Sequence, residues 1–386
     1  MSGEKNREQR QLQGLRDQID DLDRQLVELL ARRQEVVAEV VAFKKEHQLP
    51  VYHPAREADM IGSRRRQGRE AGLDADYLEE IFRNIMRYSR SIQTAEISRV
   101  GVRPGAQILI VGGAGGMGRL FRRWFTASGY RVRVLEVGDW DRVAELCLDI
   151  DLALISVPID KTVEVVKRLA PFLPPACILA DLTSVKGVTV KAMCDHFSGP
   201  VLGLHPMFGP DTRSMERQIV VITPGREGPD DGWVAEQLAA WGGVIVRAGA
   251  AEHDEIMAVV QALRHFATFT FGRFLYQHRI DLNRTLEFSS PIYRLELDMV
   301  GRLFAQDPEL YSEIIFATPE RLQLLKEYLE SFKENLEIVT DQGLGGSSGR
   351  EIFISEFQKI AAWFGPFSDQ AIRESGYLID KLIERF

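Results

Sequence analysis

Cysteine is scarce in this chain: the 386 residues include only Cys147, Cys177 and Cys194. No two of them have the CxxC spacing of zinc sites and redox motifs, and three residues do not make a disulfide framework. The sequence therefore argues against a disulfide-stapled secreted domain and against a thiolate metal site. We expect a metal-free protein in a reducing compartment.

Long apolar runs and excess positive charge are also missing. No run approaches the roughly 18 uncharged residues of a membrane span, and the opening MSGEKNREQRQ has no apolar signal region. The formal net charge is −8 and the pI is about 5.6, so the molecule should repel nucleic acid and anionic membranes. We expect a cytoplasmic protein that binds neither, and any anionic substrate must be held by local arginines.

The chain is long enough for two or three domains, and its two ends are expected to be helical. Residues 9–97 show no strand pattern. Prolines predict a long first helix that ends near Pro50 and a second that follows Pro54, with a third running from Ala75 past Ile92. From about residue 250 the pattern is helical again to the last residue.

The middle of the chain alternates short β-branched runs with helical stretches. This alternation predicts a doubly wound, mainly parallel sheet with helices on both faces. The predicted strands are QILIV at 107–111, RVRVLE at 131–136, LALISVP at 152–158, CILADL at 177–182, VLGLH at 201–205, IVVIT at 219–223 and VIVRA at 244–248.

A glycine-rich turn follows the first of these strands. Gly113, Gly115 and Gly118 form a GxGxxG at the opening of a helix, and the second strand ends in Glu136. Glycines let the backbone approach a pyrophosphate at the helix N-terminus, and the carboxylate can accept hydrogen bonds from ribose hydroxyls. Glycines serving only a tight turn would leave Glu136 unexplained. The pattern predicts a dinucleotide site that prefers NAD to NADP, because Glu136 would repel a 2′-phosphate.

Polar residues stand at three further strand ends, at 156–158, 181–186 and 205–210. Ligands of such sheets bind beyond the carboxyl ends of the strands. We assign Met117, Ser156 and Pro158 to the cofactor site. A histidine beside a nicotinamide, His205, could act as general base on a hydroxyl whose carbon loses hydride. The alternative is a turn histidine bonded to backbone.

The segment SSPIYRLELDMVGRLFAQDP, at 289–308, carries two arginines on an apolar helix. Arg294 and Arg302 are eight residues apart, so their side chains leave the helix in directions that differ by about 80°. Each could form a structural salt bridge. In an acidic protein the pair is more typical of a clamp for substrate carboxylates.

The first predicted helix has cations on an apolar stripe. Arg33 falls on the stripe, and Lys44 returns to nearly the same face about 16 Å further along the axis. A lone arginine there could snorkel to solvent or pair with a glutamate. Two cations on one inward face instead imply an anion that binds from outside, because buried unpaired charge is costly. The stripe residues are Leu15, Ile19, Leu22, Leu26, Leu29, Val36 and Val40.

Five longer segments carry a resemblance to one known family. They are VGGAGGMGRLF, DLTSVK, GLHPMFGPD, QALRHFATF and SSPIYRLELDMVGRLFAQDP. Together with the N-terminal helices they resemble the bifunctional chorismate mutase/prephenate dehydrogenase of bacterial tyrosine biosynthesis over nearly the whole chain. The resemblance implies rearrangement of chorismate to prephenate. NAD would then accept hydride from ring carbon 4 of prephenate as carbon dioxide leaves, giving 4-hydroxyphenylpyruvate.

The resemblance also implies the domain organisation and the partners. It implies a homodimer and tyrosine as a feedback inhibitor. The expected parts are an all-α helical chorismate mutase domain at 1–98, a linker at 99–105, an NAD-binding α/β Rossmann-type domain at 106–249 and an α-helical substrate and dimerisation domain at 250–386.

Matching motif by motif implies roles at the dehydrogenase site. His205 would hydrogen-bond and deprotonate the C4 hydroxyl, and Ser184 would orient that hydroxyl. Arg302 resembles the family's prephenate clamp, with Lys186 and Arg294 as supporting cations.

One further histidine lies in the family's RHF segment. His265 is expected to face the substrate or an effector. Packing in the core is the open alternative for this residue.

The resemblance places seven mutase residues in the N-terminal helices: Arg16, Arg33, Lys44, Arg56, Glu57, Ser89 and Gln93. Arg16 and Arg33 would hold carboxylates. Lys44 and Gln93 would donate to the ether oxygen as its bond breaks, and Glu57 would accept from the substrate hydroxyl. Because the rearrangement is pericyclic, catalysis needs only positioning and charge stabilisation.

One position of that site departs from the family pattern, and two others lie far apart along the first helix. His53 stands where monofunctional relatives tend to carry an aspartate, which puts that one contact in doubt. Arg16 and Lys44 are 28 residues, or about 42 Å, apart on one straight helix, too far to share one small substrate. If both contact chorismate, Arg16 must come from a second protomer.

Two other functions remain compatible with the sequence pattern. One is an NAD-dependent hydroxyacid dehydrogenase whose N-terminal helices serve only for dimerisation. The two cations of the first helix argue against this alternative. The other is a non-catalytic regulator that senses NAD or tyrosine, which would leave His205, Ser184 and the arginines unexplained. Incubation with chorismate, with and without NAD, separates all three.

Overall fold

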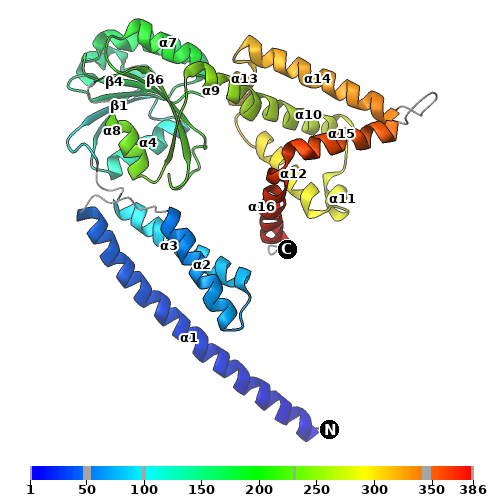
Figure 1. Cartoon of the computed structure of the whole chain (residues 1–386). Coiled ribbons are helices and arrows are strands. Elements are labelled where there is room, and N and C mark those ends of the chain that lie inside the picture. The colour runs from blue at the N-terminus through cyan, green and yellow to red at the C-terminus, as the bar shows by residue number, and fades with distance from the viewer. Residues whose placement is uncertain (1, 47–53, 98–100, 229–231, 341–348, 384–386) are drawn as a thin grey trace. The chain divides into compact units, whose positions relative to one another are not determined.

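The computed structural model describes residues 2–46, 54–97, 101–228, 232–340 and 349–383 (Figure 1). The chain divides into two compact units. The first unit consists of residues 1–157, 162–183 and 189–248, and the second of residues 158–161, 184–188 and 249–386. The predicted multidomain organisation of helical, α/β and helical parts is confirmed.

Three helices form the first part of the chain, as predicted: α1 (Ser2–Glu46), α2 (Pro54–Glu70) and α3 (Ala75–Ile97). Proline at the first position suits the start of α2, because its missing N–H would have no intrahelical partner. Gly72, at a φ of 74°, turns the chain toward α3. The Asp74 side chain then accepts hydrogen bonds from the first amides of α3, those of Asp76 and Tyr77. His53 and the predicted end of the first helix lie outside the described residues.

The apolar stripe of α1 is not buried within this chain, so the prediction of an inward face is wrong for the chain alone. The stripe residues from Leu15 to Val40 are 41–59% exposed. The buried apolar residues of α1 are Val37 and Val41, which lie on the face toward α3. Within the described residues of the first unit, the N-terminal half of α1 has no helix packed along it (Figure 1). Within the first unit the stripe is therefore open to a further packing partner.

The α/β part is a seven-stranded sheet in the order β2-β1-β3-β4-β5-β6-β7, parallel except for the β5–β6 pair. All seven predicted strands are confirmed. They are β1 (Gln107–Val111), β2 (Arg131–Leu135), β3 (Leu152–Ile155), β4 (Ile178–Asp181), β5 (Val201–Pro206), β6 (Ile219–Arg226) and β7 (Val244–Arg247). The connecting segments contain α4 (Gly116–Ala127), η1 (Val137–Arg142), α5 (Val143–Leu146), α6 (Ile159–Leu169), η2 (Ala170–Phe172), α7 (Gly187–His196) and α8 (Gly232–Ala240).

Both faces of the sheet are covered, because alternate residues of each central strand enter different cores. Leu109 of β1 packs in the core that includes residues of α6 and α7, whereas Ile108 and Ile110 pack with residues of α4 and α8. Because both faces of this sheet are buried, the central strands have continuous apolar sequences. The arrangement leaves the carboxyl ends of the strands as the edge where polar side chains can gather.

The C-terminal part is helical, as predicted. Its helices are α9 (Ala250–Met257), the π-helical η3 (Ala258–Leu263), α10 (Arg264–Gln277), α11 (Leu282–Glu287), α12 (Pro291–Phe304), α13 (Pro308–Phe316), α14 (Pro319–Thr340), α15 (Gly349–Phe364) and α16 (Pro366–Ile383). Prolines again begin helices, and the side chains of Ser290 and Asp307 cap α12 and α13. In the described part of the chain no helix has the length and apolar character to span a bilayer.

Candidate active sites

The glycine-rich turn joins β1 to α4 in a conformation that only glycine fits. Gly112 has a φ of 81°, and a Cβ there would collide with the carbonyl oxygen of Ser156. A Cβ on Gly118 would collide with the carbonyl oxygen of Gly112. Gly115 caps α4 without a side-chain acceptor, so the helix N-terminus faces the turn with backbone groups alone. Such a turn suits a pyrophosphate. The sequence reasoning missed Gly112, which the GG pair at 112–113 could have signalled.

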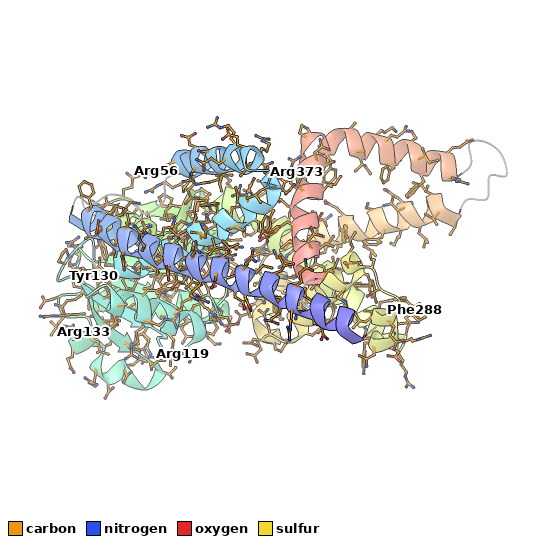
Figure 2. The ribbon with its side chains drawn as sticks, turned by 90° about the horizontal axis from the view of Figure 1, so that it is seen from below. Arg56, Arg119, Tyr130, Arg133, Phe288 and Arg373 are labelled. Atoms are coloured by element: carbon orange, nitrogen blue, oxygen red, sulfur yellow. The ribbon has the colours of Figure 1, made fainter. Side chains whose placement is uncertain are left out.

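Glu136 is connected to this turn. Its Oε1 accepts a hydrogen bond from the backbone N–H of Ala114 at 2.7 Å, and its own N–H donates to Asp139 at 2.9 Å. Arg119 of α4, labelled in Figure 2, donates to the carbonyl oxygen of Ala114. The carboxylate therefore orders the turn, and its remaining lone pairs can still accept from hydroxyl groups.

The strand register brings the first residues of the three predicted polar segments to one edge of the sheet. Ile155, the residue before Ser156, pairs with Asp181, and Asp181 pairs with Gly203 of β5. His205 lies two residues further along β5 and is 2% exposed. Asp181 is fully buried and accepts hydrogen bonds from the backbone and side chain of Thr183. The histidine is thus held on a rigid strand beyond the end of β4.

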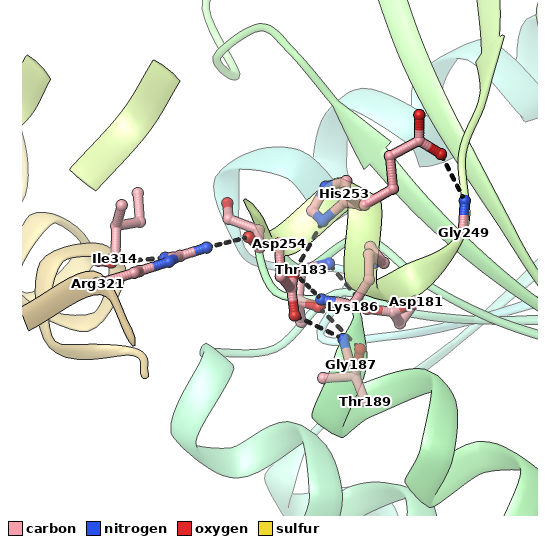
Figure 3. A network of polar contacts seen from close by, with 12 residues as sticks. Asp181, Thr183, Lys186, Gly187, Thr189, Gly249, His253, Asp254, Ile314 and Arg321 are labelled. Carbon is pink, nitrogen blue, oxygen red and sulfur yellow. Dashed lines mark hydrogen bonds and ion pairs between the residues drawn. The ribbon is translucent and has the colours of Figure 1, made fainter. Parts of the chain in front are cut away.

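The segment that contains Ser184 and Lys186 belongs to the second unit. Ser184 is half-buried, whereas Lys186 is fully buried. The carboxylate of Asp254, on α9, accepts hydrogen bonds from the backbone N–H groups of Lys186 and Gly187 (Figure 3). Sequence reasoning did not find Asp254, because no motif marks it.

The two arginines of α12 differ in exposure. Arg294 is half-buried near the start of the helix, and Arg302 is exposed in its last turn. Within the part of the chain that the structure describes, Arg302 has no ion-pair partner. A guanidinium without a protein carboxylate is suited to an anionic ligand.

His265 is buried near the start of α10. Its ring packs edge-on against Tyr311 with a centroid distance of 4.7 Å, and Nη2 of Arg264 lies 3.1 Å from its Nδ1. Burial, and then the charge of Arg264, lowers the pKa of His265 to about 4. The ring is therefore neutral near pH 7, in a packed environment.

This histidine should make stability depend on pH. The unfolded histidine binds a proton below about pH 6.5, while the folded one does so only near pH 4, so the unfolding free energy should fall as pH drops through this window. We expect His265→Gln to flatten that slope in urea unfolding measured at pH 4.5 and 6.5. His278→Gln, at an exposed position after the same helix, is the control. An unchanged slope in the His265 variant would contradict the assignment.

The cations of α1 meet polar side chains of α3. Nη1 of Arg33 donates to the Ser89 hydroxyl at 2.5 Å, and Nζ of Lys44 lies 3.4 Å from Oε1 of Gln93. All four side chains are at least half-buried. The structure thus brings together four of the seven residues assigned to the mutase site.

Positive charge accumulates around these residues. Burial, and then repulsion by Arg64, lowers the pKa of Arg33. Burial, and then repulsion by Arg56, lowers the pKa of Lys44, although Glu57 acts in the opposite direction. Cations held at such a cost are stabilised by a bound anion. Arg64, on α2, was not found from the sequence.

Glu57 is engaged by arginines. Its Oε1 accepts from Nη1 of Arg90 at 2.5 Å, and its Oε2 lies 3.4 Å from Nη2 of Arg217. Arg90 is 7% exposed and also donates to Glu216. Burial alone would lower the pKa of Arg90, but hydrogen bonds to the two carboxylates raise it. Arg90 was another residue that the sequence did not single out.

The remaining mutase residues are exposed. Arg56 lies in the first turn of α2 (Figure 2). Arg16 lies on the N-terminal half of α1, which runs without a break from Ser2 to Glu46. An unbroken helix places Arg16 about 42 Å from Lys44, so this chain does not bring Arg16 to its own cluster.

Three family models match successive parts of the chain. A model described as chorismate mutase type II matches residues 15–94. Two models described as the nucleotide-binding and dimerization domains of prephenate dehydrogenase match residues 130–248 and 249–345. One match falls in each of the three parts of the fold.

Individual proteins resemble the chain over nearly its whole length. The T-protein of Enterobacter agglomerans is 44% identical over 96% of this chain and 97% of its own length. The T-protein of Haemophilus influenzae is 41% identical over 96% and 97%. A crystal structure of prephenate dehydrogenase from A. aeolicus, with hydroxyphenyl propionate and NAD+, has a TM-score of 0.52 at 19% identity, over 72% of this chain and 99% of that chain, and so shares the fold.

Proposed function

Since this chain belongs to the T-protein family of bifunctional chorismate mutase/prephenate dehydrogenases, we propose that it performs both reactions at separate sites. The observation that carries the proposal is that one chain contains two cations of α1 against polar side chains of α3, and also a glycine-rich turn and a histidine at strand ends of one sheet. The first suits a dianion that rearranges without proton transfer. The second suits oxidation of a hydroxyl-bearing carbon.

At the mutase site catalysis depends on electrostatic stabilisation of the substrate and the transition state. Arg33 holds a carboxylate of chorismate, and Lys44 and Gln93 donate to the ether oxygen as negative charge develops there. Ser89 orients the Arg33 guanidinium through its hydrogen bond. Glu57 accepts from the substrate hydroxyl while Arg90 fixes its position.

At the dehydrogenase site the chain binds, orients and moves one proton. The turn at Gly113, Gly115 and Gly118 fits a pyrophosphate, and NAD supplies the hydride acceptor when bound there. His205 accepts the proton of the C4 hydroxyl as the carbon loses hydride and the ring carboxylate leaves as carbon dioxide. Arg302 holds a prephenate carboxylate, supported by Arg294.

A homodimer is part of this proposal. The exposed apolar stripe of α1 would be stabilised by burial against a partner, and Arg16 is too far from Arg33 and Lys44 of its own chain to share their substrate. A second chain packed along α1 meets both requirements and gives two composite sites. We also propose a mutase domain at 1–98, a linker at 99–105, an NAD-binding domain at 106–249 and a substrate and dimerisation domain at 250–386, with tyrosine as inhibitor and the cytoplasm as location.

Incubation of the purified chain with chorismate tests the function. Without NAD, we expect prephenate to accumulate. With NAD, we expect NADH, carbon dioxide and 4-hydroxyphenylpyruvate in equal amounts. Unconsumed chorismate together with oxidation of another hydroxyacid would favour the dehydrogenase with a non-catalytic N-terminal domain. No turnover of either kind would favour a regulator.

Glu136→Ala should change cofactor choice. The variant loses the acceptor for the Ala114 amide, so NAD should bind about tenfold more weakly, corresponding to one charge-assisted hydrogen bond. It also loses the repulsion of a 2′-phosphate, which favours NADP. The preference for NAD over NADP should narrow. Titration of both cofactors measures this, with exposed Asp141→Ala as control. An unaltered preference would remove Glu136 from the ribose contact.

A further inference from the structure

A buried polar network holds the backbone of the segment Ser184–Gly187 (Figure 3). Oδ1 of Asp254 accepts from the N–H of Lys186, and Oδ2 accepts from the N–H of Gly187, both at 2.8 Å. The two oxygens of one carboxylate therefore bind two consecutive amides. Because α7 begins at Gly187, the same carboxylate also places negative charge at the N-terminus of that helix, which is stabilising.

Two further side chains complete the network. Nδ1 of His253 lies 2.8 Å from Oδ1 of Asp254, and His253 is 1% exposed. Arg321 of α14, also 1% exposed, donates to the carbonyl oxygen of Ile314 at 2.6 Å and to that of Ser184 at 3.4 Å. The segment is thus held at its first residue by Arg321 and at its last two residues by Asp254.

The negative charge of Asp254 is maintained by these contacts. Burial tends to raise the pKa of Asp254, but hydrogen bonds from His253 and from the two backbone amides lower it. A carboxylate that stays ionised keeps accepting both amides throughout the neutral range. At Gly187 a Cβ would lie 2.9 Å from Oδ2 of Asp254, so a side chain there would displace the carboxylate from its present position.

We propose that Asp254 and Arg321 are positioning residues of the dehydrogenase, which hold the Ser184–Gly187 backbone so that the Ser184 hydroxyl is presented to the C4 hydroxyl of prephenate. The inference rests on the proposed function of Ser184. Neither residue contacts the substrate; both act through the backbone of Ser184–Gly187. A hydroxyl on a fixed backbone keeps its orientation through the reaction. A hydroxyl on a mobile segment would sample many unproductive orientations.

A double-mutant cycle between Asp254→Asn and Ser184→Ala tests the inference. The amide keeps the shape of the carboxylate but turns one acceptor into a donor that faces a backbone N–H. We expect Asp254→Asn to lower dehydrogenase kcat by about 10- to 100-fold with little change in KM for prephenate. In the Ser184→Ala background the same change should cost less than about threefold, because the hydroxyl it positions is already gone.

Controls separate positioning from general damage. Glu255→Gln removes an exposed carboxylate next in sequence and should leave kcat unchanged. Mutase activity and NAD affinity of Asp254→Asn should equal those of the wild type. An equal loss of kcat in both backgrounds, an unchanged kcat, or a parallel loss of mutase activity would overturn the inference.

Two further measurements keep the test decisive. If Asp254→Asn does not fold, Arg321→Lys takes its place in the cycle, because it keeps the buried charge but loses the donation to Ser184. Residue-resolved hydrogen exchange on the wild type should show slow exchange at the amides of Lys186 and Gly187. Exchange of these two amides at random-coil rates would refute their hydrogen bonds to Asp254. A wild type that is inactive with prephenate would instead refute the proposed function while leaving this exchange result intact.

Discussion

We expect the His205→Asn enzyme to lose its dehydrogenase turnover by about 10²- to 10⁴-fold, the usual contribution of a positioned general base. The variant keeps a hydrogen-bonding side chain of smaller volume at the end of β5 but cannot accept the hydroxyl proton. No substrate carboxylate loses its partner, so KM for prephenate should change little. Steady-state kinetics with prephenate and NAD measure both quantities.

The control for this variant is His196→Asn, an exposed histidine in the last turn of α7. It should retain full activity. Chorismate mutase activity and NAD affinity should be intact in both variants, which shows that the chain still folds. A large rise in KM with unchanged kcat would assign His205 to binding instead of proton transfer.

The second large effect is expected from mixed dimers. Arg16→Ala and Lys44→Ala chains should each lack mutase activity as homodimers. Co-expressed in equal amounts, half of the dimers are mixed, and each mixed dimer has one site with both cations and one with neither. Random pairing should therefore restore about a quarter of wild-type mutase activity. Dehydrogenase activity should be little changed in every sample.

The structure supplies a matched pair that must not complement. Arg33 and Lys44 both contact α3 of their own chain, through Ser89 and Gln93. Co-expressed Arg33→Ala and Lys44→Ala chains therefore leave one defect in every site, and activity should stay at the homodimer level. Differently tagged chains purified together prove that mixed dimers form. Recovery in this pair, or none in the Arg16 pair, would refute the shared site.

Much of the α/β part could be predicted from the sequence because its signals are local. Strands buried on both faces must be apolar throughout, so runs such as QILIV at 107–111 stand out. The glycines of the turn are required by backbone sterics over seven residues, and Glu136 follows one strand later. Local rules of this kind need no knowledge of the distant chain.

The apolar stripe of α1 shows the limit of such rules. Periodicity correctly predicted a continuous helix and placed Arg33 and Lys44 on one face. It could not tell which molecule covers the stripe, because an amphipathic pattern is the same whether the partner is another helix of the chain or a second copy. Only the packed structure shows that Val37 and Val41 are buried within the chain and that the residues from Leu15 to Leu29 are not.

The sequence by itself determined the three-part organisation, the strands, the glycine-rich turn and the presence of cations on α1, since these follow from composition and short-range spacing. Only the tertiary structure decided the pairing of Arg90 with Glu57 and the clamp of Asp254 on the amides of Lys186 and Gly187. Arg90 and Glu57 are 33 residues apart, and Asp254 and Lys186 are 68 apart. In such contacts hydrogen bonds offset the cost of burying charge. They form only where the packing of whole helices brings the partners together, which leaves no periodic trace along the chain.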